Sequence, residues 1–239
     1  IETLSSQRDA DASHALDALG SAAGVLSKLG YFDDAARLFA RGDALAARDL
    51  STAARENYWR QRAWVALRAS DANGAAAAIA RSLAAQTESP AEFTALRRAE
   101  AHALAAEIAL AAGDAPTARA ELALAAPVLL AEYPAAHAQR TAFDVLQARS
   151  RLLDGDATGA LALAQASVAL LGNADDAAKD RLQAQYVIAR SAAMLGRCDD
   201  ARAALALAQS ERDALNPLLP RERAAFDAAS AGVDGACGR

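Results

Sequence analysis

The side chains that most often carry out chemistry in proteins are scattered in this sequence. The motifs typical of dinucleotide-binding, phosphate-binding, zinc-protease, serine-hydrolase and protein-kinase sites are all absent. His14, His102 and His137 are isolated, so we interpret them as structural or surface residues rather than as metal ligands. These patterns predict no catalytic residue, no metal site and no cofactor.

One segment is similar to a calcium-binding loop. In DGDATG, Asp154, Asp156 and Thr158 stand at alternate positions and Gly159 is sixth. The twelfth position is Gln165 rather than the bidentate glutamate that the ion requires. The segment is also explained as the turn of a repeat, described below, and we interpret it as a turn.

Two pairs of neighbouring aspartates, Asp33/Asp34 and Asp199/Asp200, have the composition of a catalytic acid pair. Both pairs lie at the expected start of a helix. Carboxylates there accept hydrogen bonds from free amide groups and interact favourably with the helix dipole. We therefore interpret both pairs as helix caps, and SPAE at 89–92 as a capping box that opens another helix.

The two cysteines, Cys198 and Cys237, are too few for a disulfide framework. A bridge between them would staple the C-terminal tail to the last repeat, which makes sense in an oxidising compartment. The alternative is two unrelated thiols in a cytosolic protein. The sequence leaves both open, and with them a periplasmic or a cytoplasmic location.

The composition favours helices built around small side chains. Hydrophobic residues make up 54% of the 239 positions but aromatic residues only 5%, and alanine, the strongest helix former, is abundant. The net charge of −5 comes from interspersed charges without a basic block, which argues against nucleic acid as a partner. No apolar stretch is long enough to insert into a membrane. Because the chain begins at Ile1, we expect it to be a segment of a larger polypeptide.

A short phrase recurs along the chain. It reads GYFDDAARLFARG from Gly30, GDAPTARAELALA from Gly113, GDATGALALAQAS from Gly155 and GRCDDARAALALA from Gly196. The last two intervals are 42 and 41 residues, whereas the first is 83 and leaves room for a degenerate copy in which Ser70 replaces the glycine. A period near 42 over five units predicts an array of helical repeats.

Each unit divides into two helices, A and B, on either side of this turn. Helix B carries a small residue, an apolar residue four positions later and another small residue three after that, as Ala35, Phe39 and Gly42 do in the first unit. These positions share one helix face. Residues 217–230 are predicted to form a further helix that caps the array. We therefore divide the chain into a polar lead-in (1–12), a helical array with its capping helix (13–231) and a flexible tail (232–239).

At these residues the chain resembles the tetratricopeptide repeat (TPR) family. The first unit, from Leu19 to Phe39, reads LxxAAxxLxxxGxFxxAxxxF. The long period resembles the members with longer helices, such as kinesin light chains and the arrays attached to bacterial regulators and kinases. The resemblance implies an all-α, right-handed superhelical solenoid of about five TPR-like helix pairs plus a C-terminal capping helix.

In arrays of this family the A helices line a concave groove, which here would present arginine, aromatic and polar side chains. The residues expected to bind a ligand there are Asn57, Arg60, Trp64, Arg68, Glu107, Arg149, Tyr186 and Arg190. Arginine grips carboxylates with two parallel hydrogen bonds and aromatic rings supply rigid contact area, so the groove is predicted to bind a protein or acidic peptide. The alternative is that arginine is simply the usual base of this protein and that Trp64 fills space between helices.

The resemblance implies a non-catalytic protein- or peptide-binding scaffold. The expected host is a larger bacterial signalling protein, either a membrane-anchored serine/threonine kinase or a transcriptional regulator, with this segment as its sensor or docking domain. The alternative function is an oligomerisation scaffold that self-associates and has no peptide groove.

Overall fold

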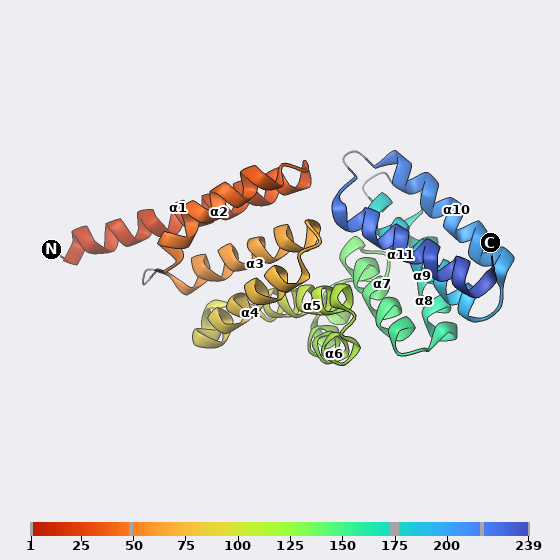
Figure 1. Ribbon diagram of the computed structural model, residues 1–239. Helices are drawn as coiled ribbons and strands as arrows, with labels where there is room; N and C mark the ends of the chain where they lie inside the picture. The colour runs from red at the N-terminus through yellow and green to blue at the C-terminus, as the bar shows by residue number, and fades with distance from the viewer. Residues whose placement is uncertain (1, 48–49, 173–176, 216–217, 239) are drawn as a thin grey trace. The chain divides into compact units, whose positions relative to one another are not determined.

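A computed structural model describes residues 2–47, 50–172, 177–215 and 218–238, and this part of the chain folds as successive helix pairs (Figure 1). The α-helices are α1 (Glu2–Lys28), α2 (Phe32–Ala46), α3 (Thr52–Arg68), α4 (Ala72–Glu88), α5 (Ala95–Ala112), α6 (Ala115–Glu132), α7 (Ala138–Leu153), α8 (Ala157–Leu171), α9 (Ala178–Met194), α10 (Cys198–Ala214) and α11 (Pro220–Cys237). A short 3-10 helix, η1 (Pro90–Glu92), precedes α5. The fold is therefore all-α, a TPR-like array of sequential helix pairs.

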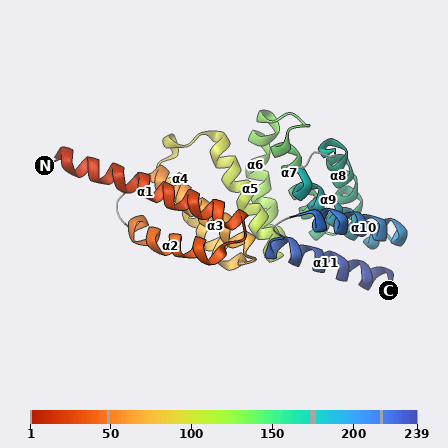
Figure 2. The same cartoon turned by 90° about the horizontal axis from the view of Figure 1, so that it is seen from above.

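The chain forms two compact units rather than the single array expected over residues 13–231. Unit 1 covers residues 1–112 and contains α1 to α5, and unit 2 covers residues 113–239 and contains α6 to α11. In unit 1, α3 packs against both α1 and α4, and α4 also packs against α5. In unit 2, α9 packs against α8 and α10, and α11 lies along α9 and α10, as both views show (Figures 1 and 2). None of the helices in the described ranges is long and apolar enough to cross a membrane.

The core of each unit combines alanines at helix contacts with a few large side chains. In unit 1, Ala63 and Ala75 are fully buried next to Leu67 and Ile79. The largest fully buried side chain is Tyr58, whose ring lies so close to Gly42 that a Cβ there would collide with it. Burying one Leu or Ile side chain stabilises a fold by roughly 1.5–3 kcal/mol, so small helical units like these are stabilised by many modest contacts.

The turns inside the pairs share one backbone conformation. Gly30, Gly113, Gly155 and Gly196 all have positive φ, and Ser70 has φ 63° at the equivalent place. At Ser70 the motif closes with two hydrogen bonds, from the Ser70 amide to Leu67 O and from the Asp71 amide to Ala66 O. This is the helix-ending geometry that glycine adopts without strain. The interpretation of Ser70 as the stand-in for glycine is confirmed.

Three aspartates cap the B helices that follow these turns. Asp71, Asp114 and Asp156 each accept a hydrogen bond from the amide three residues later. In the segment similar to a calcium loop, Asp156 is therefore engaged with the Gly159 amide at 2.8 Å, as its interpretation as a turn requires. Within the described ranges, no group of three or more His, Cys, Asp or Glu side chains is placed to hold a metal ion.

Two of the expected caps are different. The aspartate pairs at 33/34 and 199/200 lie in the first helical turn, where they suit the helix dipole, but the N-cap residues are Tyr31 and Arg197 and neither makes a side-chain cap. Asp34 and Asp200 instead form ion pairs with nearby arginines. The predicted capping box at Ser89 is also wrong, because Ser89 precedes η1 and accepts no side-chain cap bond. The Thr94 hydroxyl accepts from the Arg97 amide at the start of α5 instead.

Both ends of the chain are more helical than expected. The predicted lead-in belongs to α1, which runs without a break from Glu2 to Lys28. The predicted capping helix is longer than expected and extends from Pro220 to Cys237. The expectation of a flexible tail is therefore wrong for residues 232–237, which form the last turns of α11.

Candidate functional site

The predicted binding residues of unit 1 form a stripe along α3. Asn57, Arg60, Trp64 and Arg68 are spaced three or four residues apart, which puts them on one helix face, and all four are half-buried. Glu107 is half-buried on α5. The four side chains of α3 differ in what holds them, and this separates them into two pairs.

The first pair belongs to a buried polar network around Glu56, which we call the Glu56 network. The carboxylate of Glu56 is fully buried and accepts hydrogen bonds from the Ser82 hydroxyl and the Gln86 amide, both at 3.1 Å. Its second oxygen receives two hydrogen bonds from the Arg97 guanidinium, at 3.1 and 2.8 Å. Since these partners come from α4 and α5, one carboxylate connects three helices of unit 1.

Asn57 and Arg60 complete the Glu56 network. Asn57 donates to Asp17 of α1 at 3.1 Å and accepts from Arg60 and Arg97 at 2.9 and 3.2 Å. Arg60 lies 3.4 Å from Glu56, and its Nε is buried without a hydrogen bond from the described residues. Burial and the nearby Arg97 charge lower the Arg60 pKa. Both side chains thus position α3 against its neighbours, a role that the sequence did not indicate.

The second pair is Trp64 with Arg68. The Arg68 guanidinium lies over the Trp64 ring, 5.3 Å from its centroid, and donates to the buried Ser27 hydroxyl of α1 at 2.9 Å. Cation–π stacking of this kind contributes about 0.5–1 kcal/mol at an exposed site. It holds the indole and the guanidinium in one orientation on the surface of α3, as a binding site requires.

In unit 2, the predicted residues are not brought together in the same way. Arg149 on α7 and Arg190 on α9 are half-buried. A Cβ built on Gly232 of α11 would lie 3.7–4.0 Å from three side-chain atoms of Arg190, so this arginine runs along α11.

Tyr186 is a core residue, which corrects its assignment to the groove. It is 5% exposed, its hydroxyl donates to the Glu222 carbonyl oxygen at 3.3 Å, and its ring meets Phe226 edge-on. Burial raises its pKa well above the usual range. The residue is covered by α11, whose extent the sequence pattern underestimated, and it is not available to a ligand while α11 is docked.

Sequence reasoning missed a second aromatic site on α3. The Trp59 ring lies between two guanidinium groups, 4.3 Å from Arg81 and 5.3 Å from Arg62, and meets Tyr58 edge-on. Arg62 is also 5.5 Å from the Phe39 ring. The signal was present as an aromatic residue and an arginine three positions apart in YWRQR, next to the stripe that we had singled out.

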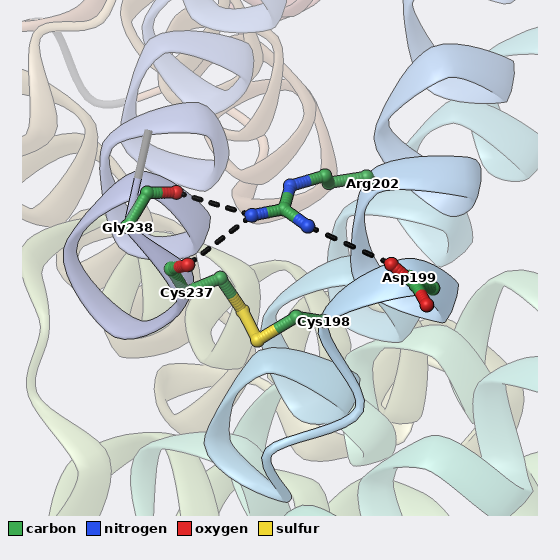
Figure 3. The surroundings of a disulfide bond; sticks show 5 residues. All are labelled: Cys198, Asp199, Arg202, Cys237 and Gly238. Carbon is green, nitrogen blue, oxygen red and sulfur yellow. Dashed lines mark hydrogen bonds and ion pairs between the residues drawn. A yellow bond between two sulfur atoms is a disulfide. The ribbon is translucent and has the colours of Figure 1, made fainter.

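The two cysteines form a disulfide bond. It joins the first residue of α10 to the last residue of α11, across a sequence separation of 39 and a Cα–Cα distance of 5.5 Å. Figure 3 shows Arg202 beside it: its guanidinium donates to the carbonyl oxygens of Cys237 and Gly238 at 3.1 and 3.3 Å and lies 3.6 Å from Asp199. Of the two interpretations of the cysteines, the structure contains the bridge.

No protein-family model matches the chain, and no curated protein matches it. Among solved structures, the chain is similar to the crystal structure of a variant protein from Podosopora anserina, described as a kinesin light chain with nearly identical TPR-like repeats. The sequences are 19% identical, the TM-score is 0.63, and the match covers 84% of this chain and 95% of that chain. At this identity the likeness concerns the fold alone. The chain therefore has the fold of a TPR-like helical repeat domain.

Proposed function

We propose that this chain is a non-catalytic scaffold that binds a protein segment carrying acidic groups, and that Trp64 and Arg68 of unit 1 form the centre of the site. The observation that carries the proposal is the pairing of these two side chains on the surface of α3. Tryptophan and arginine dominate the energetics of protein interfaces, and a guanidinium held by an aromatic ring is already oriented for a carboxylate.

The proposal narrows the predicted groove. Asn57 and Arg60 support the site from below through the Glu56 network, and Tyr186 is covered by α11. The proposed setting, inferred from the family resemblance, is the sensor or docking domain of a larger bacterial signalling protein.

The test selects binders from a displayed library of short peptides rich in Asp and Glu, using the full chain. Affinities of the selected peptides are then compared for the wild type, Arg68→Glu and Arg41→Glu. Arg41 is an exposed arginine of α2, so this control makes the same charge change away from the site. We expect Arg68→Glu to weaken binding at least about tenfold and Arg41→Glu to leave it unchanged. Equal affinities in all three proteins, with helicity unchanged, would place the site elsewhere.

A second candidate function, self-association, is supported by a different surface. Val25, Leu29 and Tyr31, at the end of α1 and the turn after it, are 57%, 53% and 56% exposed. Neighbouring exposed apolar side chains of this size are typical of interaction sites. Sedimentation equilibrium of the wild type and Leu29→Glu tests this candidate, and a wild type that stays monomeric at high concentration would count against it.

A further inference from the structure

We propose that the Cys198–Cys237 disulfide is a redox-operated latch on α11. While the bond is intact, α11 stays docked on α9 and α10. When the bond is reduced to two thiols, α11 leaves its place and uncovers Tyr186. The inference is independent of the proposed function, because it concerns unit 2 and requires no ligand.

The side-chain packing of α11 is weak for a helix of its length. Its buried residues in the described part are Glu222, Ala229 and Val233, whereas α9, one residue shorter, has ten. One of the three opposes docking: Glu222 Oε2 is buried without a hydrogen bond from the described residues, and Lys179 Nζ lies 4.0 Å from the other oxygen. Burying a carboxylate with so little compensation is unfavourable. Val233 and Ala229 alone provide little apolar surface to hold the helix.

The last two turns of α11 also have a poor helix-forming sequence. Gly232 and Gly235 both lie there and both are exposed. Glycine in a helix interior is less favourable than alanine because it loses more backbone freedom on folding. A Cβ at Gly235 would meet nothing within 4 Å, so no close contact explains this glycine. This end of the helix therefore depends on interactions outside its own backbone.

The covalent bond acts at this weak end. Cys237 is the last helical residue, and the Arg202 guanidinium holds the carbonyl oxygens of Cys237 and Gly238, as Figure 3 shows. Arginine in this position satisfies carbonyls at a helix C-terminus and interacts favourably with the helix dipole. Breaking the S–S bond would leave the exposed Arg202 contacts to hold the end of a glycine-containing helix.

The bond is placed where a reductant can reach it. Both cysteines are partly exposed, and the neighbouring residues 194–197, 199 and 200 are exposed. A dithiol supplies the chemistry: its thiolate attacks one sulfur of the bridge and forms a mixed disulfide, and the other cysteine leaves as a thiolate. The second thiol of the reductant then displaces the first cysteine. The two cysteines end as thiols that carry the two protons, and the reductant is oxidised to a disulfide.

Release of α11 would expose a defined apolar surface. Tyr186 and Leu182 of α9 and Ala208 of α10 form one cluster with Ala229 of α11. Phe226 of α11 meets the Tyr186 ring edge-on and lies under the Arg212 guanidinium, 4.2 Å from the ring centroid. Tyr186 is thus the side chain whose accessibility reports whether α11 is docked.

The test uses hydrogen–deuterium exchange of the full chain before and after treatment with dithiothreitol, with thiol counting by intact mass. We expect amides of residues 220–237 to exchange at least tenfold faster in the reduced protein, and Tyr186 to become reactive in hydroxyl-radical footprinting. Peptides from α3 and α4, in the unit without cysteines, should be unchanged, and reoxidation should restore protection. Cys237→Ser should behave like the reduced protein without any reductant.

Two outcomes would overturn the inference. If residues 220–237 keep their protection in fully reduced protein, α11 is held by its packing and the bond is no latch. If α7 to α10 lose protection together with α11, the bond stabilises the whole unit rather than one helix. Because the wild type is compared with itself, both outcomes can be observed even if the cysteine variant does not fold.

Discussion

Ser70 shows at the scale of a single residue how the repeat turn constrains the sequence. It has φ 63° in the turn where the other units have glycine, and its side chain is exposed. A residue with a Cβ costs about 1–2 kcal/mol in this left-handed conformation. We therefore predict that Ser70→Gly raises the free energy of unfolding of unit 1 by about 1 kcal/mol, measured by urea denaturation followed by circular dichroism.

The reciprocal change in unit 2 provides a control for this prediction. A Cβ on Gly155 would meet no atom within 4 Å, so Gly155→Ser changes backbone strain without a steric clash. Because Gly155 has φ 84°, this variant should be less stable than the wild type by a similar amount. Stabilisation by Gly155→Ser, or no effect of Ser70→Gly, would mean that the turn conformation contributes little to stability.

Glu56 is the residue on which the polar interior of unit 1 depends. Removing one partner of a buried ion pair leaves the other charge without compensation, at a cost of about 3–5 kcal/mol. We predict that Glu56→Ala destabilises unit 1 by about 3 kcal/mol, since Arg97 and Arg60 both lose their carboxylate. The measurement is the shift of the urea unfolding midpoint.

The matched control for Glu56 is Glu88. It pairs with Arg55 at 2.9 Å, but its side chain is 56% exposed. Exposed ion pairs contribute at most about 1 kcal/mol, so Glu88→Ala should shift the midpoint far less. If the two variants lose the same stability, burial of the Glu56 network is not what makes it important.

At the scale of the helix, α11 combines a good amphipathic start with a poor end. Gly235→Ala adds a methyl group in open space and a better helix former, worth about 1 kcal/mol. We predict that this variant slows amide exchange of residues 230–237 in the reduced protein more than in the oxidised protein, where the disulfide already holds the helix end. Equal slowing in both states would argue that the disulfide does not support these turns.

The helix scale is also where the sequence was most and least informative. The turn positions followed from a backbone requirement, positive φ, that limits the choice of residue so strongly that even the Ser70 substitute could be recognised. The helix pairs followed from small residues at regular spacing. The end of α11 was not predicted because Gly232 and Gly235 are typical of a flexible tail, and the contacts that order it come from residues far away in sequence.

The candidate site was predicted less completely for a related reason. Spacing put Asn57, Arg60, Trp64 and Arg68 on one face of α3, but it could not say what lies opposite each side chain. Arg60 and Asn57 proved to be committed to Glu56, and Tyr186 to α11. Which partners neutralise a charge depends on the packing between helices, and this is not encoded in the period of one helix.

At the scale of the whole chain, the division into two compact units has a thermodynamic consequence. Each unit has its own buried apolar clusters, with Leu16, Phe39 and Tyr58 in unit 1 and Leu182 and Val187 in unit 2. Both cysteines lie in unit 2. The redox state of the chain should therefore change the stability of one unit and not that of the other.

We predict that fragments 1–112 and 113–239 each fold and unfold cooperatively when produced separately. Closing a loop across 39 residues stabilises a folded chain by up to about 4 kcal/mol, because the unfolded state loses conformational freedom. Dithiothreitol should thus lower the urea midpoint of fragment 113–239, by about 1–2 M for a chain of this size, and leave that of fragment 1–112 unchanged. If fragment 1–112 does not fold alone, the two units are not independent. If 113–239 keeps its midpoint when reduced, the constraint on its unfolded state is offset in the folded state. The amount by which the shift falls short of the loop-closure value would then measure how much of α11 is already undocked in the reduced fragment, since a helix that has left its place before unfolding has no docking energy left to lose.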